Sequence, residues 1–143
     1  MTAFSHQTHA VSTNPATGEA IGHYPYQSSA ALDAALDRAA AGFALWRRTE
    51  VGERARLILA LASAIRENAP AMARMITLEM GKPLAQARGE VEKCAQLCKW
   101  YAAQGPGMLS AESTLVDNGT ARIEYRPLGP ILAVMPWNFP VWQ

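Results

Sequence analysis

The stretch ILAVMPWNFP, residues 131–140, decides the fold that the sequence predicts. Its first half, 131–135, is an unbroken apolar run that is short and partly β-branched. Such a run is typical of a strand buried on both faces of a parallel sheet. A parallel neighbour requires a crossover connection, usually a helix, so the run predicts an α/β fold and the first strand of its sheet. Because the sequence ends at Gln143 without a second such run, we expect an incomplete fold.

The second half of the stretch, PWNFP, follows at the carboxyl end of that strand, where open α/β sheets bind their ligands. Pro136 ends the strand, and Pro140 suits the first turn of a helix because it lacks an N–H. Asn138 therefore lies on a stiff strand-to-helix connection. Its amide could donate to a carbonyl oxygen that becomes an oxyanion, an interaction worth about 2.7–4 kcal/mol of barrier. Alternatively, Asn138 caps the helix that begins at Pro140, and spacing alone favours this cap.

Upstream, apolar residues recur at steps of three and four and predict a layer of four helices. The four predicted apolar faces are Leu32, Leu36, Ala39, Phe43 and Trp46; Leu57, Ile58, Leu61, Ala64 and Ile65; Met72, Met75, Ile76 and Met80; and Leu84, Ala87, Val91, Cys94 or Ala95, Cys98 and Tyr101.

Local signals set the expected ends of these helices. The predicted boundaries are a cap at Ser28 or Ser29, a second cap at Thr49, Pro70 in the first turn of the third helix, Gly81 at its end, Pro83 opening the fourth helix, and Gly105-Pro106-Gly107 closing it.

Two shorter patterns predict strands outside the parallel sheet. Turn residues in NPATGE, followed by apolar residues in 21–26, predict a small hairpin or a pair of edge strands. Between Thr120 and Arg126 apolar and charged residues alternate, which is typical of a strand with one solvated face.

The composition excludes several classes of function. Lys and Arg number 13 and Asp and Glu number 12, so the net charge of +1 gives no electrostatic case for nucleic acid or an anionic membrane. No apolar run approaches the roughly 20 residues of a membrane span, and residues 1–13 show no secretory signal. Two cysteines form no disulfide framework. Together these features favour a cytoplasmic protein.

Neither the cysteines nor Lys82 are expected to be catalytic. Cys94 and Cys98 lie within the fourth predicted helix and are expected to be buried structural thiols. We expect no metal site, because no Cys-x-x-Cys occurs and all three histidines lie near the N-terminus. Lys82 follows a helix end, where lysines are usually solvated and favour the helix dipole.

Several motifs resemble one family. NPATGE, EMGKP and EYRPLGPILAVMPWNFP, in this order from about Thr8 to Gln143, resemble the N-terminal part of the aldehyde dehydrogenase superfamily. LCKWYAAQGPGMLSAE and PWNFPVWQ look most like its succinate-semialdehyde dehydrogenase branch.

The resemblance implies a reaction and roles for named residues. Family members oxidise an aldehyde with NAD or NADP: a cysteine thiolate attacks the aldehyde, hydride passes to the nicotinamide, and a glutamate activates the water that hydrolyses the thioester. Carried over from the family, Asn138 stabilises the oxyanion. The segment Met135, Pro136, Trp137 and Asn138 lies along the cofactor, and Phe139 and Gln143 border the aldehyde pocket.

The resemblance also implies what is missing. The family's nucleophilic cysteine and its glutamate lie beyond the position of Gln143, so we expect the chain alone to be inactive. We expect residues 1–143 to be the N-terminal part of the enzyme and 118–128 to be a strand that pairs with another subunit of a homo-oligomer. The alternative is a short, non-catalytic interaction module that associates with dehydrogenase subunits.

Overall fold

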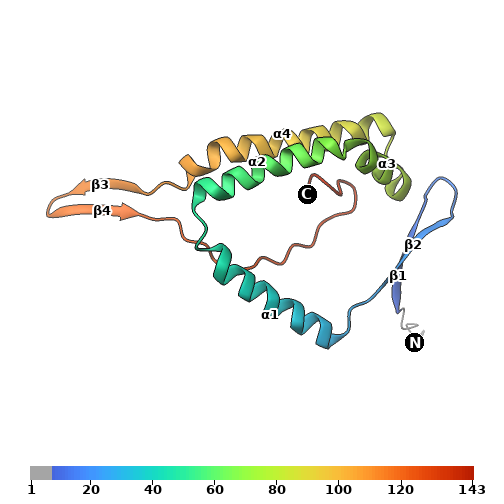
Figure 1. Ribbon diagram of the computed structural model, residues 1–143, viewed down its shortest axis with the longest axis horizontal. Helices are drawn as coiled ribbons and strands as arrows, with labels where there is room; N and C mark the ends of the chain where they lie inside the picture. The colour runs from blue at the N-terminus through green and yellow to red at the C-terminus, as the bar shows by residue number, and fades with distance from the viewer. Residues whose placement is uncertain (1–7) are drawn as a thin grey trace.

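A computed structural model describes residues 8–143 of the chain. Its elements, shown in Figure 1, are β1 (His9–Thr13), β2 (Ala20–Pro25), α1 (Ser29–Trp46), α2 (Val51–Glu67), α3 (Ala69–Met80), α4 (Leu84–Met108), β3 (Glu112–Val116) and β4 (Gly119–Ile123). α2 and α4 run side by side and α3 joins them at one end, so that a helical layer separates two β-hairpins. No helix of the described part of the chain is long and apolar enough to span a membrane.

Most predicted helix boundaries are confirmed. The Ser28 hydroxyl accepts a hydrogen bond from the Ala31 N–H at 3.2 Å and caps α1. Pro70 lies in the first turn of α3, and Gly81 ends that helix in the left-handed conformation, with φ of 74°. The cap predicted at Thr49 is wrong, because α2 has Glu50 at its N-cap and no side-chain cap bond.

The end predicted for the fourth helix is also wrong. α4 continues through Gly105-Pro106-Gly107 to Met108. A proline is costly inside a helix because it removes one backbone hydrogen bond and crowds a carbonyl. The last turn nevertheless closes, since the Leu109 N–H donates to Gly105 O at 3.1 Å and the Ser110 hydroxyl donates to Pro106 O at 3.1 Å.

The core lies where α2, α3 and α4 meet, and small residues let these helices approach closely. The buried apolar residues are Ala62, Ala73, Ile76, Ala87, Val91, Cys94 and Ala95. The predicted face of α4 is therefore confirmed at its centre. The faces predicted for the first two helices are not buried. In α1, Leu32, Leu36 and Trp46 are all exposed, and in α2 Leu57 and Leu61 are exposed while the buried residue is Ala62.

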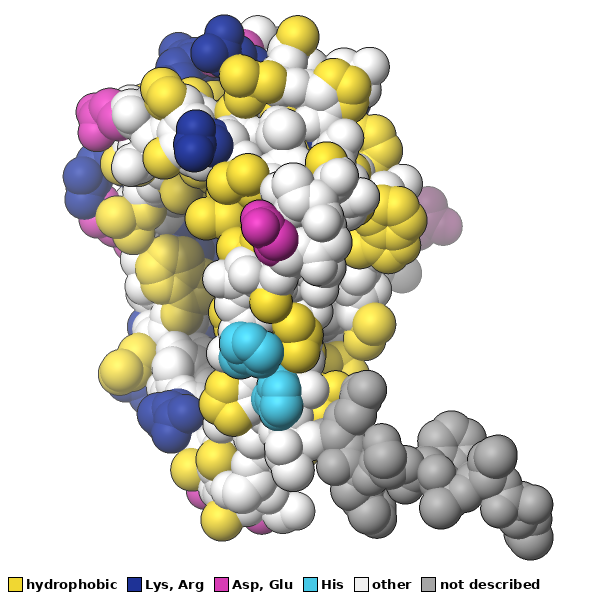
Figure 2. Space-filling model, turned by 90° about the vertical axis from the view of Figure 1, so that its right-hand side faces the viewer, with side chains coloured by type: hydrophobic (Ala, Val, Ile, Leu, Met, Phe, Trp, Pro, Cys, Tyr) yellow, Lys and Arg dark blue, Asp and Glu magenta, His cyan; other side chains and the backbone are white. Residues whose placement is uncertain are grey.

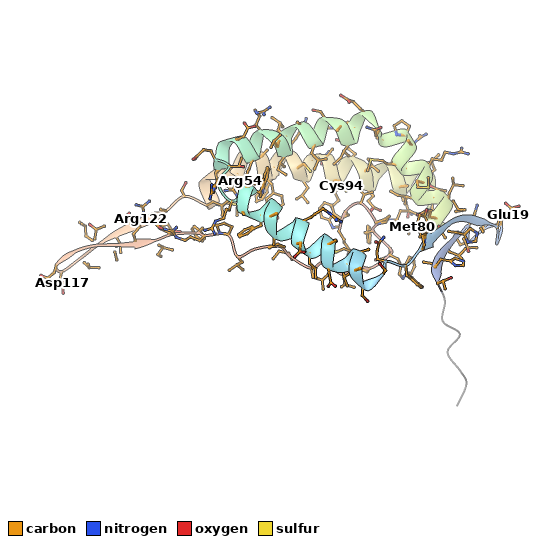
Figure 3. The ribbon with its side chains drawn as sticks, turned by 60° about the horizontal axis from the view of Figure 1, so that its bottom comes forward. Glu19, Arg54, Met80, Cys94, Asp117 and Arg122 are labelled. Carbon is orange, nitrogen blue, oxygen red and sulfur yellow. The ribbon has the colours of Figure 1, made fainter. Side chains whose placement is uncertain are left out.

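The two hairpins are antiparallel. β1 pairs with β2, which confirms the hairpin, one of the two predicted alternatives, with a bulge between Ser12 and Thr13. The predicted strand 120–126 is confirmed as β4 but ends at Ile123, and its partner β3 was not predicted. Every residue of β3 and β4 is exposed, and Asp117 at the tip lies well away from the helices (Figure 3).

The expected first strand of the parallel sheet is not formed. Residues 131–135 are an extended coil, with Leu132 90% exposed. A strand requires a hydrogen-bonded neighbour. Both sheets of the described chain are two-stranded hairpins, and neither includes residues 131–135. The coil leads from β4 back to the helical layer, where the C-terminus lies (Figure 1).

Candidate functional site

Two charged residues of the helical layer hold the segment 138–142. Lys82, between α3 and α4, donates through Nζ to the backbone oxygen of Asn138 at 3.0 Å. Glu90, on α4, accepts through Oε1 from the backbone N–H groups of Val141 at 3.1 Å and Trp142 at 3.3 Å. Lys82 and Glu90 also form an ion pair between Nζ and Oε2. The segment that contains Asn138 is thus fixed on both sides of Pro140.

Glu90 acts as the cap of the last turn of the chain. The Gln143 N–H donates to Phe139 O at 3.2 Å, which closes one helical turn after Pro140. In such a turn the unsatisfied N–H groups are those of Val141 and Trp142, and an N-cap side chain normally accepts one of them. Both donate to Glu90 here, so capping by Asn138, the alternative that spacing favoured, is wrong. The Asn138 residue is exposed.

The sequence-based expectation that Lys82 is solvated is wrong. Its side chain is 9% exposed, and that of Glu90 is 2% exposed. The Lys82 Nζ also lies 3.9 Å from the centroid of the Phe139 ring, within the range of a cation–π contact. A charged pair this deeply buried needs good geometry and further hydrogen bonds to offset its loss of hydration. The backbone of 138–142 supplies those hydrogen bonds.

Electrostatics keep Glu90 ionised. Burial by itself raises the pKa of a carboxyl group, and it is the largest single influence on Glu90. The hydrogen bonds from Lys82 and from the Trp142 and Val141 N–H groups outweigh it together, so the pKa of Glu90 lies below its usual value. The carboxylate is the form that accepts all three donors.

The residues predicted to line the site lie together on an open surface. Met135, Trp137 and Phe139 are exposed, Trp137 by 76%, and Gln143 is exposed one helical turn after Phe139. These residues are neighbours along the chain, so their closeness to Asn138 follows from the sequence itself.

An apolar cleft of about 670 Å³ adjoins this segment. Its lining comes from β1, the turn after it, α3 and the C-terminal segment: Ser12, Pro15, Met72, Met75, Ile76, Glu79, Met80, Trp137, Pro140 and Val141. Met80, at the end of α3, lies beside the β1–β2 hairpin in Figure 3. Figure 2 looks onto that end of the molecule and shows hydrophobic side chains over much of it, with two histidines side by side.

Of the two cysteines expected to be buried, Cys94 is buried and Cys98 is only half-buried. Cys94 is buried in α4, one turn beyond Glu90, and burial is the main cause that raises the pKa of its thiol. A raised thiol pKa disfavours the thiolate, which is the nucleophilic form. Residues 8–143 contain no group of three or more His, Cys, Asp or Glu side chains that could hold a metal.

Sequence reasoning considered Lys82 but set it aside as solvated, and it missed Glu90. A signal for Glu90 was present, because it lies three residues after Ala87 and four before Cys94, both on the predicted apolar face of α4. A carboxylate at such a position must find partners. No comparable signal singles out Lys82.

The profile of the aldehyde dehydrogenase family matches residues 2–143. Succinate semialdehyde dehydrogenase NAD(P)+ Sad of Escherichia coli (strain K12) is 56% identical over 136 residues, which cover 95% of this chain and 29% of that protein. Succinate-semialdehyde dehydrogenase NADP(+) 1 of Mycobacterium bovis (strain BCG / Pasteur 1173P2) is 44% identical over 133 residues, which cover 91% of this chain and 29% of that protein.

The fold is similar to that of a solved aldehyde dehydrogenase. The crystal structure of succinic semialdehyde dehydrogenase from Streptococcus pyogenes, in complex with NADP+, superposes with a TM-score of 0.87 at 30% identity and covers 92% of this chain and 29% of that one. The chain thus spans about 29% of the length of the curated relatives it matches. Because the family profile covers almost every residue, the chain belongs to the aldehyde dehydrogenase family.

Proposed function

We propose that these residues are the N-terminal portion of an NAD(P)-dependent aldehyde dehydrogenase that oxidises succinate semialdehyde, and that Asn138 stabilises the oxyanion. The observation that carries the role of Asn138 is the capping by Glu90. Because Glu90 accepts the N–H groups that a capping asparagine would take, the exposed carboxamide is left for another partner. The names of the relatives from Escherichia coli and Mycobacterium bovis support the substrate.

In this proposal the carboxamide acts on the carbonyl oxygen of the aldehyde. When a thiolate adds to the carbonyl carbon, the oxygen gains negative charge, and an N–H donor fixed beforehand lowers that barrier. Lys82 and Glu90 hold the backbone of 138–142, which lowers the ordering cost of placing the donor at the moment of reaction. The resemblance to the family assigns the thiolate and the water-activating glutamate to residues outside 1–143, and Cys94, which is buried in α4, is unsuited to be the nucleophile.

The residues proposed for the cofactor are compatible with one wall of its site. Met135, Pro136 and Trp137 are exposed and largely apolar, which suits the flat face of a dinucleotide. NAD or NADP, when bound, accepts the hydride from the substrate. Asn138 lies next along the chain, and Phe139 and Gln143 are proposed to border the aldehyde pocket.

The β3–β4 hairpin is proposed to mediate assembly. Residues 118–128 include β4, which is paired on one side by β3, and the whole hairpin is exposed. A free strand edge can accept a strand from another subunit. We therefore propose a homo-oligomer of the complete enzyme. Separately, we propose the cytoplasmic location that the composition and the two unpaired cysteines favoured.

The proposal is tested with the product of the complete reading frame that contains residues 1–143, called the full-length enzyme below. We expect it to reduce NAD or NADP with succinate semialdehyde, and faster than with butyraldehyde, the four-carbon aldehyde that lacks the carboxylate. A purified full-length enzyme that oxidises neither aldehyde with either cofactor would show the proposed function to be wrong.

One observation favours a second function. The apolar face of α1, with Leu32, Leu36 and Trp46, is exposed and could bind another protein. If the reading frame stops at Gln143 and the tagged chain co-purifies with a dehydrogenase subunit, the chain is a non-catalytic interaction module. A reading frame that continues supports the enzyme.

A further inference from the structure

We propose that Lys82 and Glu90 are positioning residues that fix the backbone around Asn138, so that its carboxamide meets the aldehyde oxygen. This inference rests on the function proposed above, and it adds two residues to the site of that reaction. It is carried by the four contacts that the pair makes to the segment 138–142.

The contacts hold this segment at both ends. Lys82 binds the backbone oxygen of Asn138 at 3.0 Å and covers the ring of Phe139 at 3.9 Å. Glu90 binds the N–H groups of Val141 and Trp142 at 3.1 and 3.3 Å. All these hydrogen bonds involve backbone atoms of the segment, so they do not occupy the donors of the Asn138 carboxamide.

The pair has a feature that stabilisation of the helices alone does not explain. Lys82 and Glu90 are eight residues apart and bind each other around the start of α4. Their other hydrogen bonds go to backbone atoms that lie 51 to 56 residues further along the chain. A buried ion pair is weak evidence for stability, because apolar side chains of similar volume often serve as well. Apolar side chains could not bind the backbone oxygen and N–H groups of this segment.

A second ion pair on the same helix provides the contrast. Arg66 of α2 and Glu92 of α4 also form a bidentate pair, with N–O distances of 2.5 and 3.0 Å. This pair is partly exposed, and its further partner is Gln96 on the same helix. Glu92→Gln therefore removes an ion pair of α4 without touching the segment 138–142, and it is the matched control.

The consequence for the reaction follows from geometry. Displacement of a catalytic group by about 1 Å can cost about 100-fold in rate. Glu90→Gln keeps an oxygen for the two N–H groups but leaves Lys82 without its anion, so we expect kcat to fall about 10- to 100-fold. KM for the aldehyde and the Kd for the cofactor should change little, because the variant alters where the donor lies and not the surface that binds.

The test is a double-mutant cycle in the full-length enzyme with Glu90→Gln, Asn138→Ala and the double variant. If Glu90 acts through Asn138, the loss caused by Glu90→Gln disappears when Asn138 is already alanine, to within about twofold, the usual scatter of additivity. Glu92→Gln should leave kcat unchanged in both backgrounds. Equal losses from Glu90→Gln in both backgrounds, or no loss in the parent enzyme, would overturn the proposal.

A second variant keeps the test decisive if Glu90→Gln does not fold. Lys82→Met combined with Glu90→Gln leaves no unpaired charge buried and removes the bond to the Asn138 oxygen, so it should give at least the same loss of kcat, again absent in the Asn138→Ala background. If neither variant folds, the pair is a requirement of folding and the proposal is wrong.

The outcomes also separate this inference from the function on which it rests. An inactive parent enzyme refutes the function, and an active parent unaffected by Asn138→Ala refutes the role of the asparagine. If Asn138→Ala impairs the enzyme and Glu90→Gln causes the same further loss of kcat in that variant, only the positioning role of Glu90 is refuted.

Discussion

Replacing Glu90 by alanine is expected to release the backbone N–H groups of Val141 and Trp142 to solvent exchange. Both donate to one carboxylate oxygen of a side chain that is 2% exposed. Hydrogen bonds to charged groups contribute about 1.5–3 kcal/mol each. Since the two N–H groups share one oxygen, we take a single such value for the pair. At about 1.4 kcal/mol per tenfold, this predicts a roughly 10- to 150-fold loss of protection.

The assay is hydrogen–deuterium exchange of the full-length enzyme, followed by mass spectrometry of a peptide that covers 137–143. Pro140 has no N–H, so Val141 and Trp142 supply a large share of the exchanging groups in this peptide. Glu90→Gln, which keeps an acceptor oxygen, should lose less protection than Glu90→Ala.

Glu92→Gln is again the control and should leave the peptide 137–143 unchanged. Unaltered exchange in Glu90→Ala would refute the view that Glu90 caps this turn. Equal loss throughout the helical layer would refute it as well, because the carboxylate would then stabilise the fold in general.

Three other predictions concern stability. Lys82→Met leaves the buried Glu90 carboxylate unpaired and should lower the free energy of unfolding by about 3–5 kcal/mol, measured by chemical denaturation. The double variant Lys82→Met with Glu90→Gln should recover much of this loss, and no recovery would contradict a charge pair. Gly81→Ala should cost about 1–2 kcal/mol, because φ of 74° strains any residue with a Cβ, and an unchanged denaturation midpoint would contradict it. The hydrogen bond from Arg66 is the main cause that lowers the pKa of Glu92 from 4.5 to about 2. The stabilisation of the fold by the ionised Glu92 is therefore complete above about pH 4.5 and is lost as the pH falls through about 2. The difference in Tm between the parent enzyme and Glu92→Gln should accordingly shrink only on acidification.

Local signals allowed the sequence to predict the helical layer. The Ser28 cap and the left-handed Gly81 each depend on residues within a few positions, and both are confirmed. The apolar face of α4 was predicted for the same reason, since helical spacing is a local property. The rule that glycine and proline end a helix placed the end of α4 at 105–107, which is too early. The helix accommodates Pro106 in its last turn and ends at Met108.

Structural features that depend on residues far away in the sequence could not be predicted from local signals. The run 131–135 has the composition of a buried strand, yet a strand is formed only where a neighbour supplies hydrogen bonds. The candidate site shows the same limit. PWNFP indicated Asn138 as a candidate, but its supports Lys82 and Glu90 lie about 50 residues earlier, and only the fold brings them to the segment.

The central claim is that the Asn138 carboxamide stabilises the oxyanion, and the rate of the chemical step tests it most directly. In a single turnover, the full-length enzyme with saturating cofactor and succinate semialdehyde is mixed rapidly and reduced cofactor is followed by absorbance at its nicotinamide band. We expect Asn138→Ala to lower this rate about 10²- to 10³-fold with an unchanged Kd for the cofactor. An unchanged rate of cofactor reduction in the Asn138→Ala enzyme would contradict the claim.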